Sequence, residues 1–285
     1  MLLAPVDYYR AENLDDAASA LSETEGARVL AGGQSLISLL KLRATQVDLL
    51  VDISRLEELR FVDVADDGSL RIGAGMTYDE LEHSDDVRSV NPIISKVASM
   101  TVDQQIRNRG TIGGNICHND PINNFPVLSV ALGAVMHLTG TGGDREVSAE
   151  DFYTGFFSTA VDEDEILHSI TFPALGDGYS VGWNEVEIGE AAARAVAVIR
   201  TENGNISDAR IALGCLPVPT LREEASSTLV GMTTEAEDIA TATADIAEGI
   251  DFFPDDPDGT SEYRRALAPV VAKRAVLDAI GGGAE

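Results

Sequence analysis

The sequence has few lysines and few cysteines, and each shortage excludes a class of protein. Lysine occurs only at Lys41, Lys96 and Lys273, and 20 basic residues face 48 acidic ones, for a formal net charge of −28. Such a surface repels nucleic acid, which excludes DNA and RNA as partners. Cys117 and Cys215 are too few for an iron–sulfur cluster that needs four thiolates. We expect both to be buried, unreactive thiols.

Long apolar runs are also missing. The longest apolar stretch, Val127–Leu138, is too short to span a bilayer. The first residues, MLLAPVDYYR, lack the basic and apolar regions of a signal peptide. The sequence therefore predicts a soluble, cytoplasmic protein without a membrane span.

The acidic residues are scattered along the whole chain, which argues against a single docking tail. One interpretation is an acidic interface for a basic partner. The interpretation we favour is a halophilic protein, in which carboxylates keep the surface hydrated and salt screens their repulsion.

Helix and strand patterns alternate irregularly along the first part of the chain. Thr77, followed three residues later by Glu80, has the pattern of a capping box and predicts a helix start. Apolar runs and turn signals predict further elements: helices at 13–25, 36–42 and 92–100, and strands at 28–31, 47–53, 69–73 and 165–172, with a hairpin tip at 139–144.

A glycine-rich stretch at 175–182 is the best candidate for a domain boundary. Beyond it, Asn203-Gly204 predicts a hairpin between strands at 193–200 and 206–213, because both residues tolerate positive φ. Three helical patterns follow, and the last, 261–280, is expected to bury one face, marked by Tyr263, Leu267, Val270, Val271, Arg274 and Leu277. The order is that of an α+β protein.

Two glycine loops carry the best candidate site. In Val29–Leu36 (VLAGGQSL) a strand ends, two glycines turn the chain and a helix begins; in Arg109–Pro121 (RGTIGGNICHNDP) a second glycine pair lies beside Thr111 and Asn115. Glycines permit close approach of the backbone to a ligand, and unpaired N–H groups bind anions. Each loop alone is equally consistent with a simple turn. Together they could supply the donors that a pyrophosphate requires.

Other signatures are absent from the sequence. Gly73-Ala74-Gly75 begins like a Rossmann fingerprint, but the third glycine position is Tyr78, and no P-loop occurs. The histidines (His83, His118, His137 and His168) do not have the spacing of metal ligands. We therefore expect no metal site and no self-sufficient catalytic residues on this chain.

The two loops resemble the paired FAD loops of the flavoprotein (medium) subunits in the xanthine dehydrogenase and carbon monoxide dehydrogenase family, the molybdenum hydroxylases. The resemblance rests on AGGQSL at 31–36 and GTIGGN at 110–115, and extends to the segments at 105–108, 120–134, 151–167 and 261–276. It thus covers nearly the whole chain.

The resemblance implies a two-lobed α+β FAD-binding domain of the vanillyl-alcohol-oxidase/PCMH type at 1–176. A small α+β domain like the C-terminal domain of the carbon monoxide dehydrogenase flavoprotein would occupy 177–285. By the same resemblance FAD would contact sixteen residues: Val29, Leu30, Ala31, Gly32, Gly33, Gln34, Ser35, Leu36, Thr101, Thr111, Ile112, Gly113, Gly114, Asn115, Asn124 and Leu167. The chain departs from its relatives at Asn124, where many have aspartate, and at Trp183, where a lysine is usual.

The family also implies partners. A large subunit would carry the molybdenum cofactor and a small subunit the 2Fe–2S clusters, in a heterotrimer that dimerises, with FAD passing electrons to an external acceptor. Two alternatives remain open: a stand-alone flavin-dependent oxidase or reductase, and a scaffold subunit that has lost its flavin.

Overall fold

The computed structural model describes residues 3–281, which fold into two compact units. The first unit comprises residues 1–118, 135–152 and 159–174, and the second comprises 119–134, 153–158 and 175–285, apart from the chain ends that are not described. Helices and sheets are mixed in both, which confirms the α+β class.

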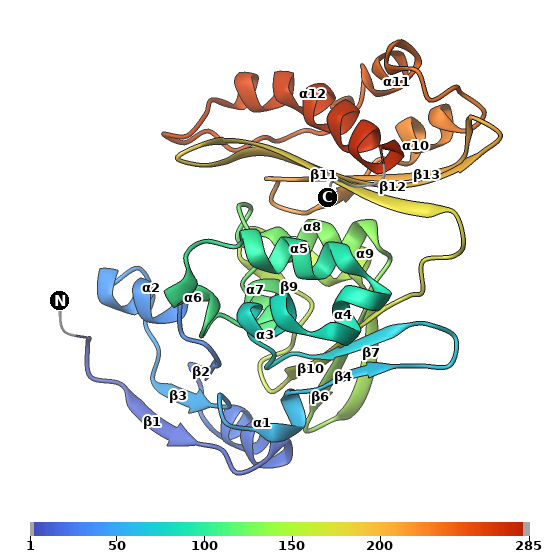
Figure 1. Cartoon of the computed structure of the whole chain (residues 1–285). Helices are drawn as coiled ribbons and strands as arrows, with labels where there is room; N and C mark the ends of the chain where they lie inside the picture. The colour runs from blue at the N-terminus through green and yellow to red at the C-terminus, as the bar shows by residue number, and fades with distance from the viewer. Residues whose placement is uncertain (1–2, 282–285) are drawn as a thin grey trace. The chain divides into compact units, whose positions relative to one another are not determined.

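A small parallel sheet opens the first unit. Its strands run in the order β1 (Asp7–Arg10), β3 (Leu49–Asp52) and β2 (Ala27–Leu30) (Figure 1). Helix α1 (Leu14–Glu23) connects β1 to β2, and α2 (Leu36–Leu42) leads from β2 toward β3. Because all three strands are parallel, their carboxyl ends meet at one edge, where ligands commonly bind in parallel sheets.

The second sheet of this unit is antiparallel. Its order is β4 (Val62–Val64), β5 (Leu70–Gly73), β10 (Ile166–Phe172), β6 (Val135–Gly140) and β7 (Gly143–Ser148). The hairpin between β6 and β7 has its tip where the glycine-rich turn predicted it.

Short helices complete the first unit. Thr77 caps helix α3 (Tyr78–His83) and forms the predicted capping box with Glu80. The helical elements are η1 (Glu57–Leu59), α3 (Tyr78–His83), α4 (Asp85–Val90), α5 (Pro92–Met100), α6 (Gln104–Arg107), α7 (Ile112–His118) and α9 (Ala149–Phe152). A small hairpin, β8 (Tyr153–Gly155) and β9 (Ser158–Thr159), follows α9, and all of it except Thr159 belongs to the second unit.

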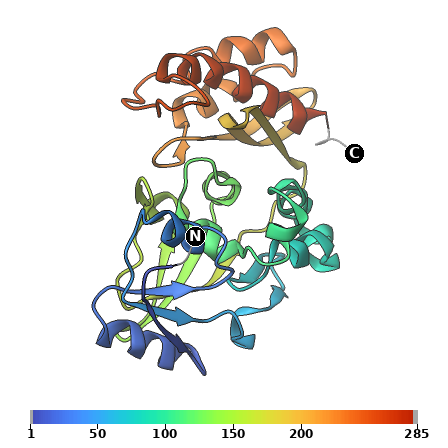
Figure 2. The ribbon, with the colours of Figure 1, turned by 90° about the vertical axis from the view of Figure 1, so that its left-hand side faces the viewer.

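A four-stranded antiparallel sheet forms the centre of the second unit. Its order is β11 (Tyr179–Ile188), β12 (Glu190–Glu202), β13 (Asn205–Gly214) and β14 (Thr220–Leu221). Helices α10 (Glu223–Leu229), α11 (Ala236–Thr243) and α12 (Ser261–Ile280) share one apolar core with it. Figures 1 and 2 show α12 lying along this sheet, and α8 (Asn124–Ala131) also contacts β12 and β13.

The second unit differs from the sequence analysis in two places. Strand β11 was not predicted as a strand, because the stretch at 175–182 reads as a linker. The buried face of α12 also differs from the predicted one, since Tyr263, Val270 and Arg274 are exposed. The helix instead buries small residues, Ala268, Val271, Ala272, Ala275, Val276 and Ala279.

Close packing explains this choice of small residues. A Cβ atom built on Gly182 of β11 would lie 1.9 Å from the carbonyl oxygen of Ala275 and 2.4 Å from the nitrogen of Ala279. The helix backbone therefore touches the sheet backbone, and larger side chains on that face would separate them.

Candidate functional site

The first glycine loop joins β2 to α2 and presents unused backbone donors. Gly33 has φ of +73°, a left-handed conformation that favours glycine. Among the residues that the structure describes, no hydrogen-bond acceptor faces the N–H groups of Gly32, Gly33, Gln34 and Ser35. Buried or half-buried N–H groups rarely lack acceptors in a finished fold. This loop therefore has the donor set of an anion site.

The second glycine loop is internally bonded. The N–H groups of Ile112 and Gly113 donate to the carbonyls of Met76 and Ala74 at 3.0 and 2.9 Å, and that of Gly114 donates to Thr111 Oγ1 at 3.0 Å. Its backbone donors are thus occupied, and the loop is fastened to the segment that follows β5.

The glycines also allow backbone segments to touch one another. A Cβ on Gly32 would lie 2.0 Å from the carbonyl oxygen of Arg109, and one on Gly113 would lie 2.7 Å from that of Ala74. Both distances are far below normal contact. Gly32 therefore brings the first loop against the start of the second, so the structure places the two sequence-predicted loops side by side.

A cavity of about 220 Å³ lies beside this contact. Its lining combines residues that follow β2 (Ala31, Gly32) with residues that follow β3 (Ser54, Arg55), and thus sits at the carboxyl edge of the parallel sheet. The other polar lining residues are Arg60, Thr77, Asn108, Arg109 and Thr111. The lining offers donors and cationic groups but no carboxylate, which suits an anionic ligand.

Asp52 fixes the segment after β3 that reaches the cavity. Its Oδ1 accepts the N–H of Ser54 at 2.9 Å, and its Oδ2 accepts the hydroxyl of Tyr8 at 2.5 Å. Burial alone would raise the pKa of Asp52, but the hydrogen bonds from Tyr8 and Ser54 hold it below its ordinary value. The carboxylate is therefore charged at neutral pH and holds the turn that carries Arg55.

Only some of the sixteen predicted contacts line this cavity, namely Ala31, Gly32 and Thr111. Thr101 ends α5 and is buried, with its hydroxyl on the carbonyl of Val97 at 2.8 Å. Leu167 is buried in β10, and Asn124 begins α8 in the second unit. Their roles remain predictions.

Sequence reasoning missed Ser54, Arg55 and Asn108 as lining residues, and it included Arg109 only as the first residue of the second loop. A usable signal existed for the first two. They follow a predicted buried strand at 47–53, and the carboxyl ends of parallel strands meet at one edge. Applying that rule to the two strands at 28–31 and 47–53 would have placed Ser54 and Arg55 beside the first loop.

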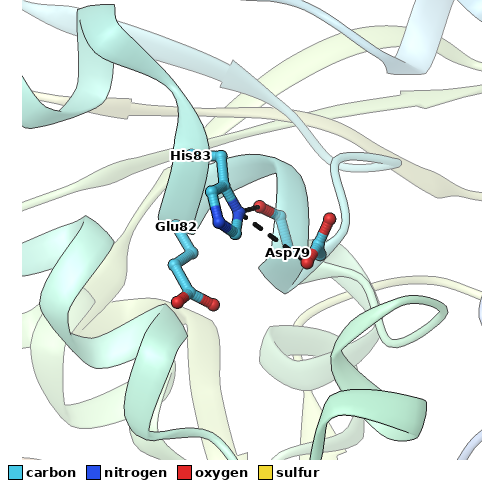
Figure 3. Close-up of side chains that lie close together, drawn as sticks. All are labelled: Asp79, Glu82 and His83. Carbon is cyan, nitrogen blue, oxygen red and sulfur yellow. Dashed lines mark hydrogen bonds and ion pairs between the residues drawn. The ribbon is translucent and has the colours of Figure 1, made fainter.

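Asp79, Glu82 and His83 of α3 form a second polar cluster (Figure 3), with possible ligand atoms within 4.8 Å of one another. Each carboxylate has another partner. Gln104 Nε2 donates to Asp79 at 2.6 Å, and Arg107 lies 3.3 Å from Glu82. His83 Nδ1 lies 2.8 Å from the carbonyl oxygen of Asp79. These groups bond to the protein, so the cluster carries no argument for a metal ion.

Two histidines and one cysteine of the first unit also have shifted pKa values. Burial, followed by the nearby charge of Arg71, lowers the pKa of both His137 and His168. Burial raises the pKa of the Cys117 thiol to about 12, so this sulfur is a thiol at neutral pH. Within residues 3–281, no helix is long and apolar enough to cross a membrane.

The chain matches known families over most of its length. Residues 4–175 match the FAD binding domain in molybdopterin dehydrogenase, and residues 189–279 match the CO dehydrogenase flavoprotein C-terminal domain.

Individual relatives agree with the family matches. The carbon monoxide dehydrogenase medium chain of Afipia carboxidovorans is 37% identical over 97% of both chains. The glyceraldehyde dehydrogenase medium chain of Sulfolobus acidocaldarius is 35% identical over 94% of this chain and 96% of its own. A solved chain of carbon monoxide dehydrogenase from Hydrogenophaga pseudoflava superposes with a TM-score of 0.94 at 33% identity, over all of both chains.

The glycine loops, the cavity with its cationic lining and these matches agree. The chain belongs to the family of FAD-binding flavoprotein subunits of molybdenum hydroxylases, and it is an oxidoreductase subunit with FAD as cofactor.

Proposed function

We propose that this chain relays electrons from 2Fe–2S clusters on a partner subunit through FAD to an external acceptor. The observation that carries the proposal is the cavity at the edge of the parallel sheet, where unused N–H groups and cationic side chains converge. Bound there, FAD would supply the chemistry of accepting and releasing electrons.

The chain's own residues would bind and orient that cofactor. The N–H groups of the first loop would donate to the diphosphate. Gly32 would keep the two loops in contact, and Gly113 would keep the second loop against the segment after β5. We propose the sixteen residues predicted from the sequence as the flavin contacts, in an FAD-binding domain at 1–176 followed by a second domain at 177–285. The half-buried His137 and His168, whose pKa values are lowered, play no part in this assignment.

Cysteine content favours clusters on another chain. Cys117 and Cys215 are the only cysteines, and a 2Fe–2S cluster needs four protein ligands, usually all cysteine. We therefore propose a small 2Fe–2S subunit and a large molybdenum subunit as partners, in a heterotrimer that dimerises in the cytoplasm. The relatives from Afipia and Sulfolobus are each a "medium chain", which is consistent with such an assembly.

A mixing experiment tests the electron route. The FAD-loaded chain is mixed anaerobically with its reduced 2Fe–2S subunit, and the visible flavin bands are followed. Loss of those bands, and their return on adding an acceptor, is the expected result. Flavin that stays oxidised while the clusters stay reduced contradicts the route. Rapid reduction of the isolated chain by an organic substrate would support the stand-alone oxidase or reductase instead.

We also propose that the acidic surface is an adaptation to high salt. The support is compositional: 48 acidic residues face 20 basic ones, and lysine is almost absent. High salt shortens the range of carboxylate repulsion, so the stability of the fold should improve as salt rises.

A further inference from the structure

Two arginines at the cavity have no acidic partner. Arg55 and Arg109 both line it, and both side chains are exposed. Within residues 3–281 neither side chain makes an ion pair or a hydrogen bond. Among the described residues, Arg28, Arg71, Arg222, Arg265 and Arg274 also lack a carboxylate partner, but none of them lines the cavity.

Other arginines show the contrast. Arg60, which lines the same cavity, is paired with Glu80. Arg145 bonds Glu165 and Arg194 bonds Glu185, at 2.6 and 2.8 Å. The charges of these arginines are neutralised inside the protein. Those of Arg55 and Arg109 are not neutralised by any carboxylate within the described residues.

The backbone holds both residues beside the first glycine loop. The carbonyl of Arg109 is the group that Gly32 approaches, and the N–H of Arg109 donates to the carbonyl of Ile106 at 3.0 Å. Arg55 follows Ser54, whose N–H is fixed by Asp52 at 2.9 Å. The two guanidinium groups therefore start from rigid positions on separate segments that flank the first loop.

We infer that Arg55 and Arg109 bind the diphosphate of FAD together with the N–H groups of the first loop; this rests on the proposed function. A guanidinium group can donate two parallel hydrogen bonds to a phosphate. The need for such groups follows from the net charge of −28, which repels a dianionic cofactor before it reaches the loop. Two local positive charges offset that repulsion where the anion binds.

The test compares cofactor affinity in three variants of the full chain. FAD binding to apoprotein is measured by calorimetry for the wild type, Arg55→Gln, Arg109→Gln and the control Arg88→Gln. Arg88 is also exposed but lies on α4, outside the cavity lining. Removing one charged hydrogen bond weakens binding by about tenfold, so we expect that loss for Arg55→Gln and Arg109→Gln and none for Arg88→Gln.

Salt and ligand series separate the remaining explanations. The loss of affinity in Arg55→Gln and Arg109→Gln should shrink as KCl rises, because salt screens the attraction between a guanidinium group and a phosphate. Equal FAD affinity in all four proteins overturns the inference and leaves the proposed function intact. A loss of NADH affinity with unchanged FAD affinity also overturns the inference and leaves the proposed function intact, because the arginines would then bind a dinucleotide acceptor. A folded wild type that takes up no FAD overturns both.

Discussion

Replacing Gly32 by alanine should disrupt the contact between the two glycine loops. The added Cβ would lie 2.0 Å from the carbonyl oxygen of Arg109 and 2.8 Å from its carbonyl carbon. Both atoms belong to backbone, so no side-chain rotation relieves the overlap, and one loop must move. Overpacking of this kind costs about 1–3 kcal/mol. We place Gly32→Ala at the upper end, about 3 kcal/mol, because the obstacle is backbone.

That loss corresponds to a fall in Tm of roughly 6–12 °C for a protein of this size. Loop displacement should also remove FAD binding, since the N–H donors of Gly32, Gly33 and Gln34 lie on the displaced segment. Differential scanning calorimetry of the apoprotein gives the Tm, and equilibrium dialysis gives the bound FAD.

Gly142→Ala is the matched control. Gly142 lies at the tip of the β6–β7 hairpin, and a Cβ there meets nothing within 4 Å. Its Tm should stay within about 2 °C of the wild type, because surface substitutions usually change stability by less than about 0.5 kcal/mol. If Gly32→Ala matched this control in both Tm and FAD uptake, the loop–loop contact would not be what requires the glycine.

Three further predictions concern other parts of the chain. Gly182→Ala should lower Tm by roughly 4–10 °C in calorimetry, because its Cβ would lie 1.9 Å from the Ala275 carbonyl oxygen; a Tm like that of Gly142→Ala would contradict this. The hydrogen bonds from Arg145 hold the pKa of Glu165 in the folded protein below its ordinary value. The pair therefore stabilises the fold fully above the ordinary pKa of about 4.3, and this stabilisation is lost as the pH falls through the lower pKa of the folded state. The Tm difference between wild type and Glu165→Gln, about 2–4 °C at neutral pH, should therefore vanish in acid, and a constant difference would refute the assignment. Raising KCl from about 0.1 to about 1 M shortens the screening length from about 10 to about 3 Å and should raise the wild-type Tm. An unchanged Tm would remove the support for salt adaptation.

Local signals in the sequence were enough for several elements. Asn203 and Gly204 have φ of +53° and +81° at the tip between β12 and β13, as the dipeptide predicted. The box formed by Thr77 and Glu80 is likewise read from a spacing of three residues. In each case neighbouring residues alone determine the backbone conformation.

Features that depend on distant pairing could not be predicted in the same way. Arg55 and Arg109 are 54 positions apart in the sequence, and they share a cavity only because β2 and β3 pair in parallel and Gly32 contacts Arg109. The buried face of α12 was missed because hydrophobic size is a poor guide where backbones touch. There Ala275 is buried while Tyr263 is exposed.

An absorption spectrum of the purified chain tests the central claim most directly. The full chain is kept in high salt, loaded with FAD and separated from the excess. We predict visible flavin bands at one FAD per chain, absent from Gly32→Ala and retained in Gly142→Ala. A folded wild-type chain that remains colourless would contradict the assignment of FAD to this chain.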